Sequence, residues 1–120
     1  MKALIIIAHG SKKELSNSEF ISMVGNIKNK DNNYDFVEAS FLELASPSIE
    51  DITNDLIRKG VKELNYYPFF LNSGRHVISD IPNIIEKLEN KNPNLKFELL
   101  EHFGKSDFIE DIILRDINIK

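Results

Sequence analysis

Cysteine is absent from the 120 residues of this sequence. Its absence excludes disulfide bonds, thiolate metal sites and a cysteine nucleophile, so any metal ion must be bound through His, Asp or Glu. Long apolar runs are absent as well. The run at 4–8 is too short to cross a membrane, and the polar residues at 9–13 follow it without a small-residue cleavage site. We therefore expect a cytoplasmic protein with no membrane partner.

Basic residues are also in short supply, with 15 Lys and Arg against 19 Asp and Glu and a formal net charge of -4. Proteins that bind nucleic acid generally present a basic stripe, so nucleic acid is not an expected partner. The length suits one domain over residues 1–120, and such a chain can bury about two thirds of its unfolded surface. The sequence contains no internal repeat, linker or low-complexity segment.

Strand-like and helix-like patterns alternate four times along the chain. Strands are expected at 3–8, 35–42, 61–71 and 95–101. Helices, each with apolar residues at helical spacing, are expected at 13–29, from about 47 to 60, at 77–88 and at 106–117. This order with short connections predicts an α/β fold, a single-domain three-layer sandwich with a four-stranded parallel sheet and helices on both faces. Glu38 and Ser40 within the second strand place that strand at an edge.

Polar side chains follow the predicted strands at the points where they end. His9 follows the first strand, Glu43 the second, His76 the third and His102 the fourth. Ligands of open parallel sheets bind beyond the carboxyl ends of the strands, so all four residues are expected at one edge. His102, within E-H-F-G, is interpreted as a surface loop residue, and whether it reaches the site stays open.

His9 is the strongest of these signals of function. A titratable side chain directly after a buried strand costs free energy unless it is hydrogen-bonded or has a functional role. Imidazole and carboxylate groups together suit a divalent metal ion. Each residue also has a structural alternative. His9 can be bonded to a neighbouring loop, Glu43 can be an exposed edge residue or a general base, and His76 can face solvent at a helix start.

Candidate anion-binding residues flank the histidines. Ser11 can cap the helix after His9, and the first-turn amides of that helix, with Lys12 and Lys13, can hold an anion. The planar guanidinium group of Arg75 can form paired hydrogen bonds with a carboxylate or a phosphate. Alternatively, Lys12 and Lys13 are solvent-exposed residues at the start of the helix without a ligand.

Three segments carry a resemblance to a known family. They are H-G-S at 9–11, F-L-E-L-A-S-P-S-I at 41–49 and P-F-F-L-N-S-G-R-H-V-I-S-D-I-P at 68–82. In order and spacing the chain resembles the small sirohydrochlorin cobaltochelatases, the CbiX type of class II chelatase, over essentially its whole length. Lys12 departs from the arginine that is common after H-G-S, and Ser46 stands where an acid is frequent.

The resemblance implies a chelatase-like, flavodoxin-related fold and an enzyme that inserts a divalent metal ion into sirohydrochlorin for cobalamin or siroheme synthesis. Co²⁺ is the expected ion, with Fe²⁺ and Ni²⁺ as alternatives, and neither ATP nor an organic cofactor takes part. The resemblance also implies a homodimer, a metal centre formed by His9 and His76, and Glu43 as its third participant, as ligand or base. Ser11, Lys12 and Arg75 are the expected contacts of the substrate.

Other functions fit parts of the same pattern. A phosphate-handling histidine enzyme usually carries arginine before its histidine, where this chain has Ala8. A flavodoxin-like binding module would use the serines after His9 in a phosphate loop. A metal carrier without catalysis would use the same histidines but show no turnover.

Overall fold

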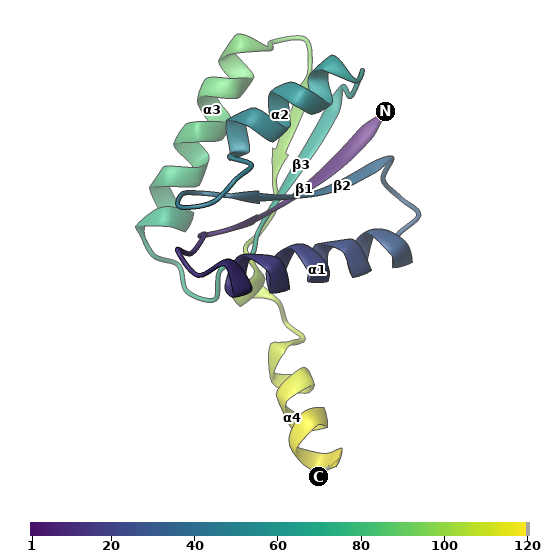
Figure 1. Cartoon of the computed structure of the whole chain (residues 1–120), viewed down its shortest axis with the longest axis vertical. Helices are drawn as coiled ribbons and strands as arrows, with labels where there is room; N and C mark the ends of the chain where they lie inside the picture. Colours follow the sequence, from purple (N-terminus) through teal and green to yellow (C-terminus); the bar gives the residue numbers. More distant parts are fainter. Residues whose placement is uncertain (120) are drawn as a thin grey trace.

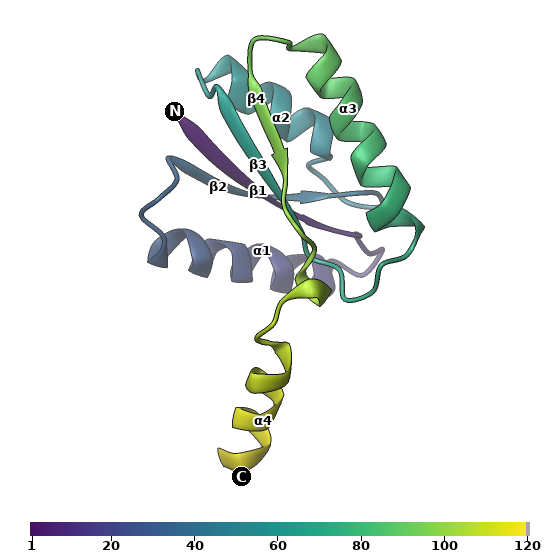
Figure 2. The ribbon, with the colours of Figure 1, turned by 180° about the vertical axis from the view of Figure 1, so that it is seen from behind.

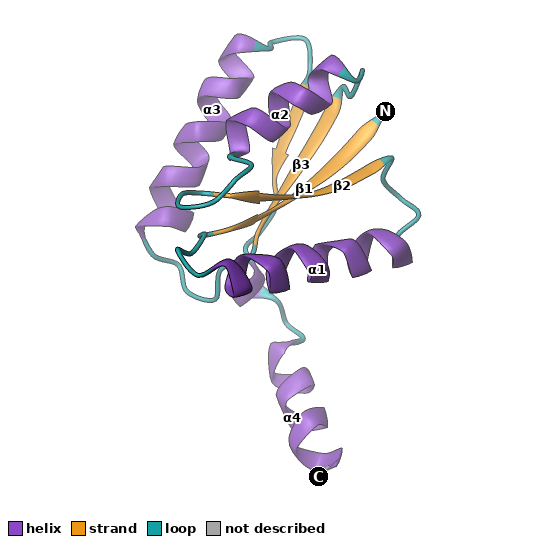
Figure 3. Cartoon of the chain, viewed as in Figure 1, coloured by secondary structure: helices purple, strands orange, loops and turns teal. Residues whose placement is uncertain are grey.

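The computed structural model describes residues 1–119, with the side chain of Ile78 left out. The elements, in chain order, are β1 (Lys2–Ala8), α1 (Glu14–Lys30), β2 (Phe36–Phe41), α2 (Ile49–Arg58), β3 (Glu63–Pro68), a π-helical turn η1 (His76–Asp80), α3 (Ile81–Lys91), β4 (Lys96–Leu99), a 3-10 turn η2 (Phe103–Lys105) and α4 (Ile109–Ile119) (Figure 3). The predicted alternation of strands and helices is therefore confirmed. β3 ends at Pro68, where the ring removes the N–H that a longer strand would use.

The four strands form one parallel sheet in the order β2-β1-β3-β4. β2 lies at an edge, as its polar residues predict, and β1 lies between β2 and β3. The continuous apolar sequence of β1 suits this place, because both of its faces are covered. Ala3, Ile5 and Ile7 pack with α2 and α3, whereas Ile6 packs with α1. Figures 1 and 2 show the resulting three layers, with α1 on one side of the sheet and α2 and α3 on the other.

The fourth helix is present but does not cover the sheet. α4 contains no buried residue and projects away from the rest of the molecule (Figures 1 and 2). The expectation of helices on both faces is thus met by α1, α2 and α3, and it is wrong for α4. The reason lies just before α4, where the backbone N–H of Gly104 donates to Phe70 O at 3.0 Å and holds η2 beside the end of β3. Within residues 1–119, no helix is both long enough and apolar enough to cross a lipid bilayer.

A buried hydrogen bond links the sheet to α2. The hydroxyls of Thr53 and Tyr66 lie 2.8 Å apart, and both residues are fully buried. Burial raises the pKa of the Tyr66 hydroxyl far above its ordinary value, and the hydrogen bond to Thr53 offsets only part of that effect. The start of α2 is held by Ser48, whose hydroxyl oxygen accepts the N–H of Asp51 at 3.1 Å. These contacts fix the helix that follows the Glu43 loop.

Candidate metal centre

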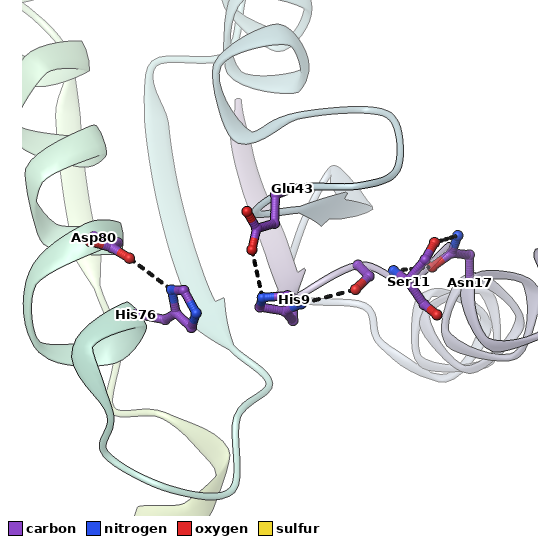
Figure 4. A network of polar contacts seen from close by, with 7 residues as sticks. His9, Ser11, Asn17, Glu43, His76 and Asp80 are labelled. Atoms are coloured by element: carbon purple, nitrogen blue, oxygen red, sulfur yellow. Dashed lines mark hydrogen bonds and ion pairs between the residues drawn. The ribbon is translucent and has the colours of Figure 1, made fainter. Parts of the chain in front are cut away.

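Three of the four predicted residues converge at the carboxyl edge of the sheet. His9 follows β1, Glu43 lies in the loop after β2, and His76 is the first residue of η1. One nitrogen or oxygen atom from each side chain lies within 4.8 Å of the other two. Figure 4 shows the ring of His9 between Glu43 on one side and His76 on the other. Two imidazoles and one carboxylate at this spacing form a donor set for a divalent metal ion.

Two backbone loops approach each other closely to bring His9 and Glu43 together. The N–H of Glu43 donates to His9 O at 3.0 Å. Gly10 has a φ of 99°, and a Cβ at this position would lie 1.7 Å from Glu43 O. Glycine alone meets both demands, because it tolerates a positive φ and leaves room for the neighbouring carbonyl. The glycine of H-G-S therefore shapes the site without contributing a side chain.

Both ring nitrogens of His9 face oxygen acceptors. Nδ1 lies 2.9 Å from Gly10 O, and Nε2 lies 2.8 Å from Glu43 Oε2. With Nδ1–H donating to the carbonyl, a neutral His9 turns the lone pair of Nε2 toward a carboxylate oxygen. Two acceptors at this distance need a proton or a cation between them. The His9–Glu43 contact is thus a place that either a proton or a metal ion can occupy.

His76 is held by a partner that the sequence reasoning missed. Its Nδ1 lies 2.7 Å from Asp80 Oδ2, within the same π-helical turn. Donation of the Nδ1–H to this carboxylate leaves the lone pair of Nε2 free for a metal ion. The ring lies between Asp80 and His9 (Figure 4), with its centroid 4.9 Å from that of His9. The four-residue spacing of His76 and Asp80 was the available signal, because such residues meet on a helix.

The cluster is open to solvent. The side chains of His9, Glu43 and His76 are 41%, 52% and 36% exposed. Glu43, His76 and Asp80 also line a cavity of about 300 Å³, together with Leu42, Asn83 and Ile84. An exposed cluster beside a cavity is accessible to a large ligand, which a closed structural metal site would not be.

Ser11 does not cap α1, contrary to the prediction. The N-cap residue is Lys13, and the hydroxyl oxygen of Ser11 accepts the N–H of Lys13 at 3.0 Å, before the helix begins. The backbone of Ser11 is instead bound by Asn17 of α1, whose side chain accepts from Ser11 N at 3.0 Å and donates to Ser11 O at 2.8 Å (Figure 4). Asn17 is buried, and as a polar residue on the sheet-facing side of α1 it could have been identified from the sequence. It anchors the loop that carries His9.

Lys12 and Arg75 lie exposed in the two loops that carry the histidines. Within residues 1–119, neither side chain makes an ion pair or a hydrogen bond with another residue. Both cations are therefore free to meet an anionic ligand at this edge of the sheet.

His102 is not the surface loop residue that the sequence predicted. It is only 6% exposed and does not join the cluster of His9, Glu43 and His76. It lines a separate cavity of about 180 Å³ with Pro68, Val77 and Glu101, among other residues. The burial follows from η2, which turns the chain back against the loop after β3 and covers the residue directly before it.

Comparison with known proteins agrees with this architecture. Residues 3–119 match the CbiX family. The chloroplastic sirohydrochlorin ferrochelatase of Arabidopsis thaliana is 31% identical over 110 residues, which make up 92% of this chain and 48% of that protein. A sirohydrochlorin cobaltochelatase of Methanococcus aeolicus is 36% identical over 89 residues, 74% of this chain and 62% of that protein.

The chain spans about half the length of curated relatives such as the Arabidopsis protein. In contrast, the crystal structure of a CbiX protein from Marinobacter aquaeolei aligns over 100% of both chains, with a TM-score of 0.81 and 27% identity. The family match covers nearly every residue, including the three motifs that carry the resemblance. This chain belongs to the CbiX family.

Proposed function

We propose that this chain is a sirohydrochlorin chelatase, a lyase that inserts a divalent metal ion into the tetrapyrrole in cobalamin or siroheme biosynthesis. The observation that carries the proposal is the open cluster of His9, Glu43 and His76 at the carboxyl edge of the sheet. Relatives named cobaltochelatase and ferrochelatase support the reaction class. Residues 1–120 act as a single chelatase domain, without ATP or an organic cofactor.

Co²⁺ is the proposed metal substrate, with Fe²⁺ and Ni²⁺ as alternatives. Nitrogen and oxygen donors such as those of His9, His76 and Glu43 accept all three ions, so availability in the cell contributes to the choice. The names of the relatives include both a cobalt and an iron enzyme. The metal that reacts fastest will therefore assign the pathway.

The geometry supports a mechanism in which the site exchanges a metal ion for protons. His9 and His76 bind the ion through Nε2, because Nδ1 of each ring is bonded to Gly10 O or to Asp80. Metal insertion displaces two N–H protons from the pyrrole rings. When the ion moves to the macrocycle, one proton can return to the position between His9 and Glu43, and the other can reach Nε2 of His76 or solvent. Glu43 thus serves as ligand to the ion and as base for the ring.

Sirohydrochlorin carries many carboxylates, and the edge of the sheet offers cations for them. We assign Arg75 and Lys12 to these side chains, because both are exposed and unpaired within residues 1–119 and lie in the loops of the two histidines. We also assign Ser11 to substrate binding, because it lies in the H-G-S loop that Asn17 holds in position.

A second subunit completes the proposal. The cluster and its cavity of about 300 Å³ form a shallow surface, which a single chain does not close over a large flat macrocycle. A homodimer would cover the second face of the substrate. The proposed location is the cytoplasm, and the place of the apolar run at 4–8 in the buried strand β1 supports it.

The deciding experiment follows the absorbance of sirohydrochlorin under anaerobic conditions with Co²⁺, Fe²⁺ or Ni²⁺, with and without the protein. We expect fast conversion to the metallated spectrum, and its loss in His9→Ala and in His76→Ala. Glu43→Gln should slow the conversion. Its matched control is Glu50→Gln, which changes an exposed carboxylate of α2. No acceleration with any of the three ions would leave the metal carrier as the function, provided that the ions still bind.

A further inference from the structure

Leu44, the residue directly after Glu43, combines backbone strain with an exposed apolar side chain. Its φ is 66°, in the left-handed region that favours glycine, and the residue is 53% exposed. A leucine in this conformation costs free energy, because its Cβ comes too close to the following carbonyl oxygen. A half-exposed side chain recovers little of that cost by packing. Strain of this kind clusters at functional sites, so Leu44 is a candidate for contact with a ligand.

A second exposed leucine occupies the equivalent position on the other side of His9. β2 ends at Phe41 and β3 ends at Pro68, so Leu44 and Leu71 each stand three residues beyond the end of a strand. Leu71 is 63% exposed. Because β1 lies between β2 and β3, the two leucines flank the strand that His9 follows. Their strands are two spacings apart, roughly 10 Å.

The groups around the two leucines indicate the kind of molecule that covers them. The metal-binding side chains lie in the same set of loops at the carboxyl edge of the sheet. Lys12 lies exposed in the loop of His9, and Arg75 lies exposed in the loop of His76. Within residues 1–119 neither cation has an ion-pair partner. Metal donors, apolar side chains and free cations at one edge are complementary to a ligand with an apolar face, a metal-binding centre and an anionic rim.

From this arrangement we infer that Leu44 and Leu71 contact the ring face of the tetrapyrrole and hold the ring over the metal centre. The inference rests on the proposed function and adds to it the residues that position the ring. Contact with the ring removes the exposed apolar surface of both leucines from water, which favours binding. The same contact excludes water from the space between the ring and the metal ion, where electrostatic interactions then become stronger.

Methyl NMR tests the contact directly. The chain, with ¹³C-labelled leucine methyl groups, is titrated with metal-free sirohydrochlorin. The ring current of a conjugated macrocycle moves the signals of protons over its face upfield, so the methyl signals of Leu44 and Leu71 should move upfield. Leu95, which precedes β4 at the opposite edge of the sheet, is the control and should not move. Leucine signals at 44 and 71 that stay in place while the ring binds would overturn the inference.

Leu44→Asn separates the contact from the backbone strain, because asparagine accepts the left-handed conformation and has a side chain of similar size. We expect the urea midpoint of unfolding to stay the same or rise, and the affinity for metal-free sirohydrochlorin to fall about 10-fold. Ile21→Asn, which changes a 47% exposed residue of α1, is the matched control and should bind the ring as the native chain does. Native affinity in Leu44→Asn would contradict the inference.

Two further measurements separate the contact from other roles of Leu44. Calorimetric titration should give Leu44→Asn the Co²⁺ affinity of the native chain. Equal losses of Co²⁺ and ring affinity would show that Leu44 acts only through the position of Glu43, and would overturn the inference. Light scattering without tetrapyrrole should give both chains the same oligomeric state. A change in that state would assign Leu44 to a contact between subunits, which also overturns the inference.

None of these measurements needs metal insertion. A chain that binds the ring through the two leucines without inserting an ion would contradict the proposed chelatase and leave the inference in place. A chain that inserts the ion while Leu44→Asn keeps native affinity for the ring would contradict the inference alone. The two failures can therefore be told apart.

Discussion

The Nδ1 atom of His76 lies 2.7 Å from Oδ2 of Asp80 across one π-helical turn, and both residues line the cavity beside the candidate metal centre. This contact selects the tautomer of His76 whose Nε2 lone pair is free. We therefore infer that Asp80 acts as a positioning residue through His76. The aspartate of the D-I-P sequence after His76 is the residue that makes this hydrogen bond.

Removing the Asp80 carboxylate should weaken metal binding. We expect Asp80→Ala to lower the affinity for Co²⁺ by about 10- to 100-fold, the usual effect of losing a partner of a metal-binding histidine. Asp80→Asn should lose less, because its amide oxygen can still accept the Nδ1–H. Calorimetric titration measures both constants, with Glu86→Gln on the exposed side of α3 as the control. Equal losses in the alanine and asparagine variants would show that charge, and not the tautomer, sets the affinity.

Glu43→Gln should separate the structure of the site from its chemistry. The amide N–H₂ can donate to Nε2 of a neutral His9, so the contact between the two loops survives. The variant cannot accept a proton from the macrocycle, and we expect the rate of metal insertion to fall by about 10²- to 10⁴-fold. Single-turnover absorbance with a preloaded metal gives that rate. An unchanged rate would remove Glu43 from the mechanism.

Gly10→Ala should damage the site through the backbone alone. A Cβ at a φ of 99° is strained and would overlap Glu43 O, so the loops of His9 and Glu43 must separate. We expect a loss of at least about 2 kcal/mol in unfolding free energy, together with weaker metal binding. Gly25→Ala is the matched control, because it lies within α1 with no atom within 4 Å of its Cβ. That substitution should stabilise the protein by about 0.5–1 kcal/mol. Urea unfolding measures both.

Tyr66 should make the protein sensitive to alkaline pH. Burial raises the pKa of its hydroxyl in the folded state above the ordinary value of 10.0. Below that value the hydroxyl is protonated in both the folded and the unfolded state, so its ionisation does not make stability depend on pH. Above it the unfolded chain ionises while the folded chain does not, so unfolding free energy falls by up to about 1.4 kcal/mol per pH unit.

Tyr66→Phe should remove this alkaline decrease, at a cost of about 1 kcal/mol at neutral pH for the hydrogen bond lost to Thr53. Urea unfolding at a series of pH values from neutral to alkaline gives both quantities. Tyr34→Phe is the control, because Tyr34 is only partly buried. A slope that is identical in the native chain and in Tyr66→Phe would contradict the assignment.

Much of the candidate site could be predicted because its determinants are local. His9, Glu43 and His76 each follow a strand that its own apolar pattern identifies, and parallel strands end at one edge of the sheet. His102 also follows the carboxyl end of a predicted strand, and it still lies outside the cluster. The position of a residue after a strand predicts only the edge of the sheet at which it lies. The burial of His102 depends on η2, which folds against the loop after β3.

The sequence by itself determined the order of strands and helices, the central position of β1 and the set of residues at the carboxyl edge, because periodicity and apolar runs act over a few neighbouring residues. The tertiary structure alone decided that Asn17, and not a cap, holds Ser11, and that Gly10 makes room for the carbonyl of Glu43. It also decided that α4 leaves the sheet uncovered. These features arise from contacts between segments far apart in the chain, and no local pattern records such contacts.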